Sequence, residues 1–339
     1  LQDSSAASDV YKRQGLTLGY GYTPSKNFYS GIGIKYYDER LDLNDMGYLI
    51  LNDRFMLNGR TQFKRTTFQE GSVLRSRLFE IGYGSKFNVD SERESSNFAL
   101  KLENNFVNLS EIKAEVFYRS TGRNTRITRG SKFAPFIKMP KGMGGYIDFT
   151  GPRRPTYVYG LRFERGRGSE HSPELGWGTK SRGYLKYMPT DTLSFSLTYQ
   201  HQRENEWLNW YGDNLLATFQ RKQRTSIVEM EWFRNNIHEL RIKAQMVAFT
   251  GREPQSFLGD LSGNLNPEDI YIPPITISEL AFQVRYRYEI MPLSYLYLVY
   301  SKGGRISLQD EEDDLFSLYR RPWNSPEKEN FTVKLRYRF

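Results

Sequence analysis

Apolar and polar residues alternate with a period of two along most of the chain after residue 14. The last nine residues show the alternation most regularly, and one face carries Phe331, Val333, Leu335, Tyr337 and Phe339. The other face carries Thr332, Lys334, Arg336 and Arg338. Similar stretches lie at residues 98–106, 112–118, 157–163, 193–199 and 280–288. This pattern predicts β-strands that have one apolar and one polar face.

Two architectures are compatible with such strands. In a soluble sandwich the apolar faces pack against each other, whereas in an outer-membrane barrel they meet lipid and the polar faces line the lumen. The alternating segments run roughly 9–14 residues, which is the length that a tilted strand needs to cross a bilayer. Aromatic residues also crowd the ends of the apolar faces, as an interfacial girdle requires. The barrel is therefore the favoured interpretation.

The connections between these segments alternate in length, as periplasmic turns and external loops do. The short connections are residues 23–27, 107–110, 188–192, 234–238 and 291–294, and each contains Pro, Asn, Asp or Ser. The long connections are residues 38–47, 88–97, 121–143, 204–216, 251–275 and 303–328. We therefore expect an all-β fold, an antiparallel transmembrane β-barrel of about 16 strands in the bacterial outer membrane.

The start of the chain does not fit this barrel. Residues 1–14 show no periodicity and no signal-peptide pattern, and residues 9–14 (DVYKRQ) resemble a translated sequencing-library adaptor found in metagenomic assemblies. We expect residues 1–14 to be such an artefact and residues 15–339 to be an incomplete barrel domain. Strand directions counted back from the C-terminus give about fifteen strands, and an even number requires a further strand before Gly15.

Composition narrows the class of protein. The chain has 339 residues with a mean hydropathy of -0.66, yet 15% of them are aromatic, which argues against disorder. Cys is absent, which excludes disulfides and thiolate metal sites. His occurs three times, so a metal site built from several histidines is improbable. The net charge of +9 suggests anionic partners. Nucleic acid is not expected, because the basic residues alternate along strands instead of clustering on one face.

Basic residues recur on the faces expected to line the lumen. They include Arg285, Arg287, Lys334, Arg336 and Arg338, and further members are Lys101, Lys113, Arg119, Arg162, Arg241 and Lys243. One interpretation is a basic pore that selects anions. The other, which we favour, is a lumen wall stabilised by cross-strand ion pairs, because acidic residues interleave with the basic ones.

Other candidate sites are weak. Asp42, Asn44 and Asp45 have calcium-like oxygen spacing, but the bidentate Glu of a full loop is missing, so an ordinary polar loop is the favoured interpretation. Residues 310–314 are all acidic and could bridge divalent cations to lipopolysaccharide phosphates, although a solvated loop tip is favoured. We find no catalytic constellation and no phosphate-binding motif, and we expect no cofactor.

The alternating C-terminal strand that ends on Phe339 resembles the assembly signal of outer-membrane barrels. This resemblance implies that the barrel assembly machinery docks the terminal aromatic residue and pairs with the strand edge. The alternative is an ordinary amphipathic strand that happens to be last. The other expected partners are outer-membrane lipid and lipopolysaccharide.

Three segments together resemble a family of uncharacterised Gram-negative proteins. They are residues 279–305 (ELAFQVRYRYEIMPLSYLYLVYSKGGR), the ending NFTVKLRYRF at residues 330–339, and DLNDMGYL at residues 42–49. Members of that family join an N-terminal module similar to family 9 carbohydrate-binding modules to a C-terminal outer-membrane barrel. The resemblance covers residues 15–339, so no sugar-binding residue can be carried over to this sequence.

The resemblance implies a barrel that serves as anchor or conduit for a carbohydrate-binding module, in binding or uptake of carbohydrate. Two alternatives stay open. The first is a transporter barrel, either a porin or a plugged receptor. The second is an outer-membrane hydrolase of glycans or lipids, whose catalytic residues would lie in the missing N-terminal part.

Overall fold

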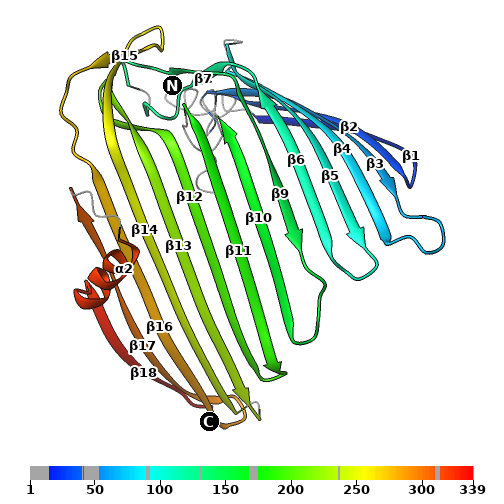
Figure 1. Cartoon of the computed structure of the whole chain (residues 1–339), viewed down its shortest axis with the longest axis vertical. Helices are drawn as coiled ribbons and strands as arrows, with labels where there is room; N and C mark the ends of the chain where they lie inside the picture. Colours follow the sequence, from blue (N-terminus) through cyan, green and yellow to red (C-terminus); the bar gives the residue numbers. More distant parts are fainter. Residues whose placement is uncertain are drawn as a thin grey trace, which may run out of the picture.

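The computed structural model describes residues 15–39, 41, 53–88, 92–129, 131–167, 175–235, 237–309 and 314–338. Most of these residues belong to one large curved sheet (Figure 1). Its strands are β1 (Gly15–Ser25), β2 (Phe28–Tyr37), β3 (Arg54–Arg65), β4 (Leu74–Phe87), β5 (Arg93–Phe106), β6 (Glu111–Arg119), β9 (Gly142–Thr150), β10 (Tyr157–Arg167), β11 (Trp177–Thr190), β12 (Leu193–Gly212), β13 (Leu215–Arg234), β14 (His238–Gly259), β15 (Leu265–Glu268), β16 (Ile275–Met291), β17 (Ser294–Leu308) and β18 (Lys328–Arg336). The short strands β7 (Gly122–Asn124) and β8 (Ile137–Met139) form a separate ladder, and helix α2 (Leu315–Asn324) lies between β17 and β18.

The strand order confirms the expected fold class. Sixteen strands belong to the main sheet of the described residues, and all neighbouring strands are antiparallel. Each strand pairs with the next one in the chain, except that β6 pairs with β9 and β14 pairs with both β15 and β16. Because fifteen strands alternate in direction from β1 to β18, these two edge strands run the same way.

The two faces of the sheet differ as the alternation predicts. On β10, Leu161 and Phe163 are 62% and 54% exposed on one face, and Arg162 and Glu164 lie on the other. Exposed Leu, Val, Phe and Tyr side chains continue this apolar face over β1 and β18 as well. A large exposed apolar surface of this extent indicates contact with a nonaqueous medium or with another protein.

One end of the sheet, which we call the turn end, carries the short connections (Figure 1). The tight turns at residues 26–27, 107–110, 191–192 and 292–293 lie there, which confirms four of the five predicted short connections. The fifth, residues 234–238, includes residue 236, which lies outside the described residues. Leu109 and Leu293 adopt positive φ in two of these turns. The longer connections lie at the opposite end, which we call the loop end.

Several of the predicted long loops are wrong in part. Residues 204–216 are mostly strand, because β12 and β13 continue to a tight turn at Asp213, where φ is 42°. Within residues 251–275, β14 continues to Gly259 and β15 pairs with its end. Residues 303–328 contain the end of β17 and helix α2, which the alternating pattern does not reveal.

Buried apolar residues gather at the loop end. Ile137, Met139, Leu208 and Leu216 form one cluster, and Ala217, Phe219 and Ile272 form another. The long strands β12 to β14 therefore extend beyond the other strands to support a small core. None of the helices in the described residues is long and apolar enough to cross a membrane.

Several predicted features lie outside the described residues. They are the segment 1–14, the weak metal candidates Asp42, Asn44 and Asp45, the acidic residues 310–313, and the terminal residue Phe339.

Candidate functional site

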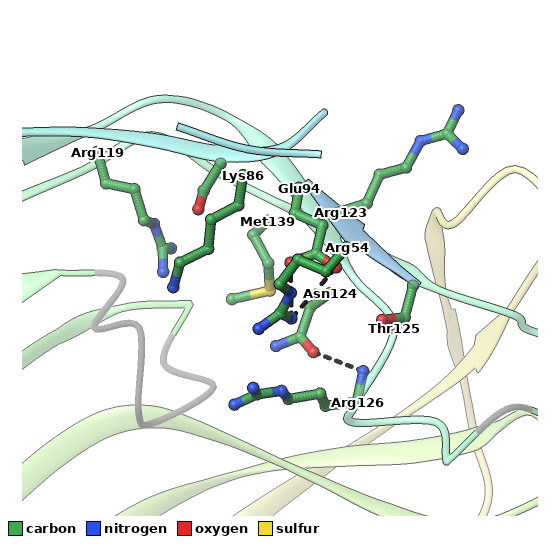
Figure 2. A pocket seen from close by; sticks show the side chains of 10 residues that line it. Arg54, Lys86, Glu94, Arg119, Arg123, Asn124, Thr125, Arg126 and Met139 are labelled. Atoms are coloured by element: carbon green, nitrogen blue, oxygen red, sulfur yellow. Dashed lines mark hydrogen bonds and ion pairs between the residues drawn. The ribbon is translucent and has the colours of Figure 1, made fainter. Parts of the chain in front are cut away.

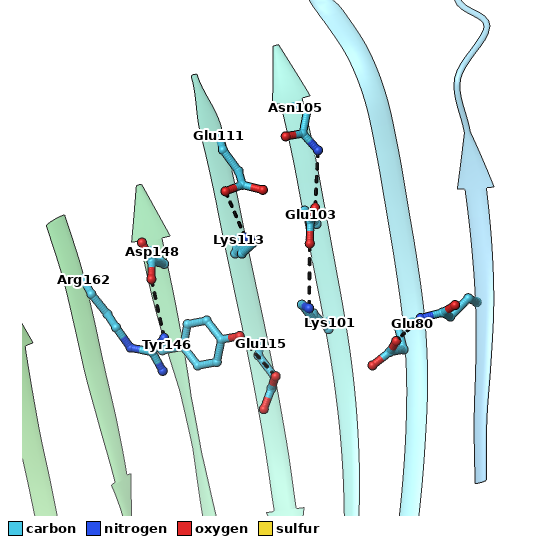
Figure 3. Close-up of polar contacts among 11 residues, drawn as sticks. Glu80, Lys101, Glu103, Asn105, Glu111, Lys113, Glu115, Tyr146, Asp148 and Arg162 are labelled. Atoms are coloured by element: carbon cyan, nitrogen blue, oxygen red, sulfur yellow. Dashed lines mark hydrogen bonds and ion pairs between the residues drawn. The ribbon is translucent and has the colours of Figure 1, made fainter. Parts of the chain in front are cut away.

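The polar face of the sheet carries a ladder of ion pairs, some within one strand and some between neighbouring strands (Figure 3). Lys113 Nζ lies 2.9 Å from a Glu111 carboxylate oxygen, and Lys101 Nζ lies 3.7 Å from Glu103. Arg162 contacts both Asp148 and Glu164, and its guanidinium stacks 3.8 Å from the centre of the Tyr146 ring. Lys113, Lys101 and Arg162 therefore each have a carboxylate close by.

The ladder continues on β13, β14 and β16. Lys243 Nζ lies 2.7 Å from Glu229, and Arg287 Nε lies 3.0 Å from Glu239. Arg241 also pairs with Glu239, so one carboxylate is shared between two arginines. Arg285 is exposed on the same face and stands opposite Arg241 in the strand register.

The predicted residues of the C-terminal segment that the structure describes lie on strand β18 or directly after it. Phe331, Val333, Leu335 and Tyr337 are 67%, 57%, 60% and 48% exposed, and their alternation puts them on the apolar face. Lys334 and Arg336 fall on the opposite face, where they pair in register with Tyr297 and Tyr295. The Arg338 backbone N–H donates a hydrogen bond to Ser294 Oγ at 3.0 Å, which ties the end of the chain to β17.

A segment of chain crosses the concave side of the sheet at the loop end. Residues 120–141 leave β6, carry β7 and β8, and return to β9 (Figure 1). At one side Gly122 lies so close to β5 that a Cβ there would be 1.6 Å from the Glu94 carbonyl oxygen. Only glycine fits this approach, since any side chain would force the two backbones apart.

At its other side the crossing segment packs on β12 to β15. Ile137 is fully buried against Leu208 and Leu216, and the Lys138 backbone N–H donates to the Gly263 carbonyl oxygen at 2.8 Å. Lys138 Nζ also donates to Asn264 Oδ1 at 2.9 Å. Because β5 and β14 lie far apart in the strand order, a segment that contacts both must span the concavity of the sheet.

A basic pocket lies between this crossing segment and the ends of β3 to β6 (Figure 2). Five cationic side chains line it, together with one carboxylate, that of Glu94. The cations are Arg54, Lys86, Arg119, Arg123 and Arg126. The cavity measures about 60 Å³, which suits a small oxyanion or the charged group of a larger solute.

Several contacts hold the cations of the pocket in place. Arg54 Nη2 donates to both Glu94 carboxylate oxygens, at 3.3 and 2.9 Å, and both side chains are largely buried. Arg123 forms an ion pair with Glu92 and lies 4.3 Å from the centre of the Phe136 ring. Asn124 Oδ1 accepts a hydrogen bond from the Arg126 backbone N–H at 3.0 Å, and this contact shapes the turn that follows β7.

The arrangement is suited to binding anions. Guanidinium groups from different elements offer several N–H donors around the pocket, and the burial of Arg54 and Arg119 strengthens their attraction for an oxyanion. In the described part of the chain, no group of three or more His, Asp or Glu side chains is arranged to hold a metal ion. His238 lies at the turn end, where its ring nitrogen is 2.6 Å from the Tyr286 hydroxyl and its ring stacks on Tyr288.

Sequence reasoning identified Arg119 but missed the rest of this pocket. The signal lies in residues 119–129, where Arg119, at the end of an alternating strand, is followed by Arg123, Arg126 and Arg129 at intervals of three or four residues. Arg54, Lys86 and Glu94 come from three separate strand ends. Only the strand register brings them to the same place.

Comparison with known proteins identifies a family and similar solved structures. A family model described as domain of unknown function (DUF5916) matches residues 2–339. No curated protein matches the chain significantly. The crystal structure of the siderophore receptor PirA from Acinetobacter baumannii is similar at 10% sequence identity with a TM-score of 0.37, over 95% of this chain and 63% of the receptor chain. The chain therefore spans less than two thirds of that receptor's length.

Proposed function

The chain belongs to the DUF5916 family, and from this premise we propose that it is an outer-membrane β-barrel whose basic mouth binds anionic solutes and admits them to the lumen. The basic pocket beneath residues 120–141 is the observation that carries this proposal, because five cations and one carboxylate meet there. Arg54 pairs with Glu94 and Arg123 with Glu92, and the lining as a whole still holds more cations than carboxylates.

The apolar face supports the membrane location. Leu161, Leu197 and Val333 are 62%, 48% and 57% exposed on this face, although Leu and Val normally avoid water. Their alternation with charged residues is the pattern of a barrel that faces lipid outside and water inside. In this arrangement the turn end faces the periplasm and the loop end faces the exterior.

An additional strand is part of the proposal. Because β1 and β18 run in the same direction, they cannot pair antiparallel with each other. An antiparallel barrel needs a strand of opposite direction between them, and we propose that such a strand closes this wall. The assembly machinery would then use the β18 edge, with Phe331, Val333, Leu335, Tyr337 and Phe339 as its signal.

A second candidate function is a membrane anchor for a carbohydrate-binding module. The ion-pair ladder favours it, because matched pairs such as Lys113–Glu111 and Lys243–Glu229 stabilise a wall without selecting a solute. An anchor of this kind would conduct few ions or none. Conductance therefore separates the two candidates.

The test is ion selectivity of the purified protein in planar lipid bilayers under a KCl gradient. We expect a reversal potential that indicates preference for chloride, since the mouth holds excess positive charge. The double variant Arg123→Gln/Arg126→Gln should move this preference toward equal permeability. Arg129→Gln is the matched control, because Arg129 lies in the same crossing segment but does not line the pocket.

Two results would count against an anion conduit. Preference for potassium would contradict a basic mouth that selects anions. An unchanged reversal potential in the double variant would show that the pocket does not determine the ion selectivity. A protein that inserts into the bilayer without any conductance would favour the anchor.

A further inference from the structure

Helix α2 lies on the apolar face of the sheet, opposite the crossing segment. The aromatic ring of Trp323 packs against Phe282 with ring centres 5.3 Å apart, and Lys302 Nζ lies 4.9 Å from the centre of the same indole. Phe282 and Lys302 are direct partners in the strand register. They share the face of Val284, while Gln283 and Arg285 lie on the polar face.

The helix crosses several strands on this face. The Tyr319 hydroxyl is 3.1 Å from Ser226 Oγ on β13, and Ser278 Oγ on β16 donates to the Leu318 carbonyl oxygen. Ser226 pairs in register with Tyr199, an exposed residue of the apolar face. Figure 1 shows the helix lying over the strands β16 and β17. It therefore covers wall that would otherwise meet lipid.

The height of the helix above the turn end matches the edge of a membrane. A strand rises about 3.3 Å per residue, or roughly 2.5 Å along the barrel axis at a tilt near 40°. Ser226 precedes the end of β13 at Arg234, and Phe282 precedes the end of β16 at Met291, so the contacts lie roughly 20 and 23 Å above the turns. The apolar band of an outer-membrane barrel is about 25 Å tall.

One side of helix α2 is buried against the sheet, and the other side is exposed. Leu318 and Pro322 are buried against the sheet, whereas Phe316 is 82% exposed and Trp323 is 42% exposed. Arg320 is also exposed and follows Phe316 by one helical turn. A Phe and a Trp that flank a cation suit the boundary between acyl chains and phosphates, where rings enter the apolar side and guanidinium groups reach the headgroups.

We propose that α2 is an interfacial helix that docks on the outer-leaflet lipid surface. Phe316 and Trp323 enter the boundary of the acyl region, and Arg320 contacts lipid phosphates. This inference rests on the membrane location proposed above. It assigns to the loop after β17 a role in fixing the height of the barrel in the bilayer.

The test uses single cysteines, because the chain contains none. The variants Phe316→Cys, Tyr271→Cys and Leu197→Cys carry a bimane label in phosphatidylcholine vesicles that contain lipids brominated near the headgroup. Tyr271 is the matched control, since it is 85% exposed but lies in the connection between β15 and β16. Leu197 reports on the apolar face itself.

We expect the brominated lipids to quench the labels at positions 316 and 197 severalfold more than the label at position 271. If position 316 behaves like position 271 while position 197 is quenched, α2 stands in water and the inference is overturned, although the membrane location stands. An unquenched label at position 197 would instead overturn the membrane location and the inference together.

The role of Arg320 has its own readout. Adding phosphatidylglycerol to the vesicles should increase quenching of the label at position 316, because the anionic surface attracts the cation. The variant Arg320→Gln should lose this increase, and Arg153→Gln, which removes an exposed arginine at the turn end, should keep it. An increase that survives Arg320→Gln would overturn the contact with phosphate.

Discussion

The inner wall and the basic pocket use the same residue types in different ways. On the wall, Lys113 and Lys243 each lie within 3 Å of a carboxylate, and their side chains remain about a third or more exposed. In the pocket, Arg54 is almost fully buried and shares the lining with four other cations and one carboxylate. The carboxylates beside Lys113 and Lys243 offset their charges locally, whereas the lining of the pocket carries more cations than carboxylates.

This difference indicates where selectivity can arise. Solvent and nearby carboxylates screen the paired cations of the wall, which weakens their field at the polar face. The pocket combines an excess of cations with the burial of two of them, Arg54 and Arg119, and both features strengthen its attraction for an anion. The crossing segment is what separates the two regions, because it brings Arg123 and Arg126 over the strand ends.

The largest expected effect comes from removing the crossing itself. Gly122→Val places a side chain where a Cβ alone would meet the Glu94 carbonyl oxygen at 1.6 Å, so β7 must move away from β5. We expect at least tenfold faster proteolytic cleavage within residues 120–141 and loss of the anion preference. Gly59→Val is the control, because its nearest neighbour is at 3.8 Å; equal cleavage rates in both variants would contradict the close approach.

The next effect concerns the apolar anchor of the crossing segment. Ile137→Ala removes a fully buried side chain between Leu208 and Leu216, and we expect a loss of about 3 kcal/mol in the free energy of unfolding. Val116→Ala, on the exposed apolar face, should cost about 1 kcal/mol or less. Urea unfolding of the protein in lipid vesicles measures both, and equal losses would show that the segment is not anchored there.

The ion pairs of the two regions should differ by a smaller amount in their contribution to the free energy of unfolding. Glu94→Gln leaves the buried Arg54 without its carboxylate partner and should destabilise the protein by about 2 kcal/mol. Glu111→Gln breaks the more exposed pair with Lys113 and should cost about 0.5 kcal/mol. The same urea titration compares them, and a larger loss for Glu111→Gln would reverse the proposed contrast.

The smallest effect is on ion permeation. The double variant Glu111→Gln/Lys113→Gln removes a matched pair from the wall, so the reversal potential should stay close to that of the unmodified protein.

Raising the salt from 0.1 to 1 M shortens the Debye length from about 10 to about 3 Å and should weaken the anion preference of the mouth. A wall variant that shifts the reversal potential as strongly as Arg123→Gln/Arg126→Gln would place selectivity along the whole lumen.

The sequence predicts the wall well because each membrane-type strand has one apolar and one polar face. The prediction from alternating residues fails where both faces of a strand are buried. In the upper part of β13, Leu216, Ala217, Thr218 and Phe219 are consecutive and all buried, so the alternation disappears although the hydrogen-bonded ladder continues. Helix α2 is missed because it has only ten residues and contains Pro322.

The pocket could be predicted only in part. The repeated arginines of residues 119–129 point to a basic segment, but they do not reveal what it contacts. Arg54 and Glu94 are 40 residues apart and meet through the register of β3, β4 and β5. The close approach at Gly122 likewise depends on a crossing that no local pattern specifies.

The most direct test of the central claim is the environment of two consecutive residues on β12. Leu197 lies on the apolar face and Thr198 on the polar face. In vesicles, a bimane label at Leu197→Cys should be quenched by brominated lipid and protected from aqueous iodide, and a label at Thr198→Cys should show the opposite response. If iodide quenches both labels equally, the apolar face does not meet lipid, and the outer-membrane barrel is contradicted.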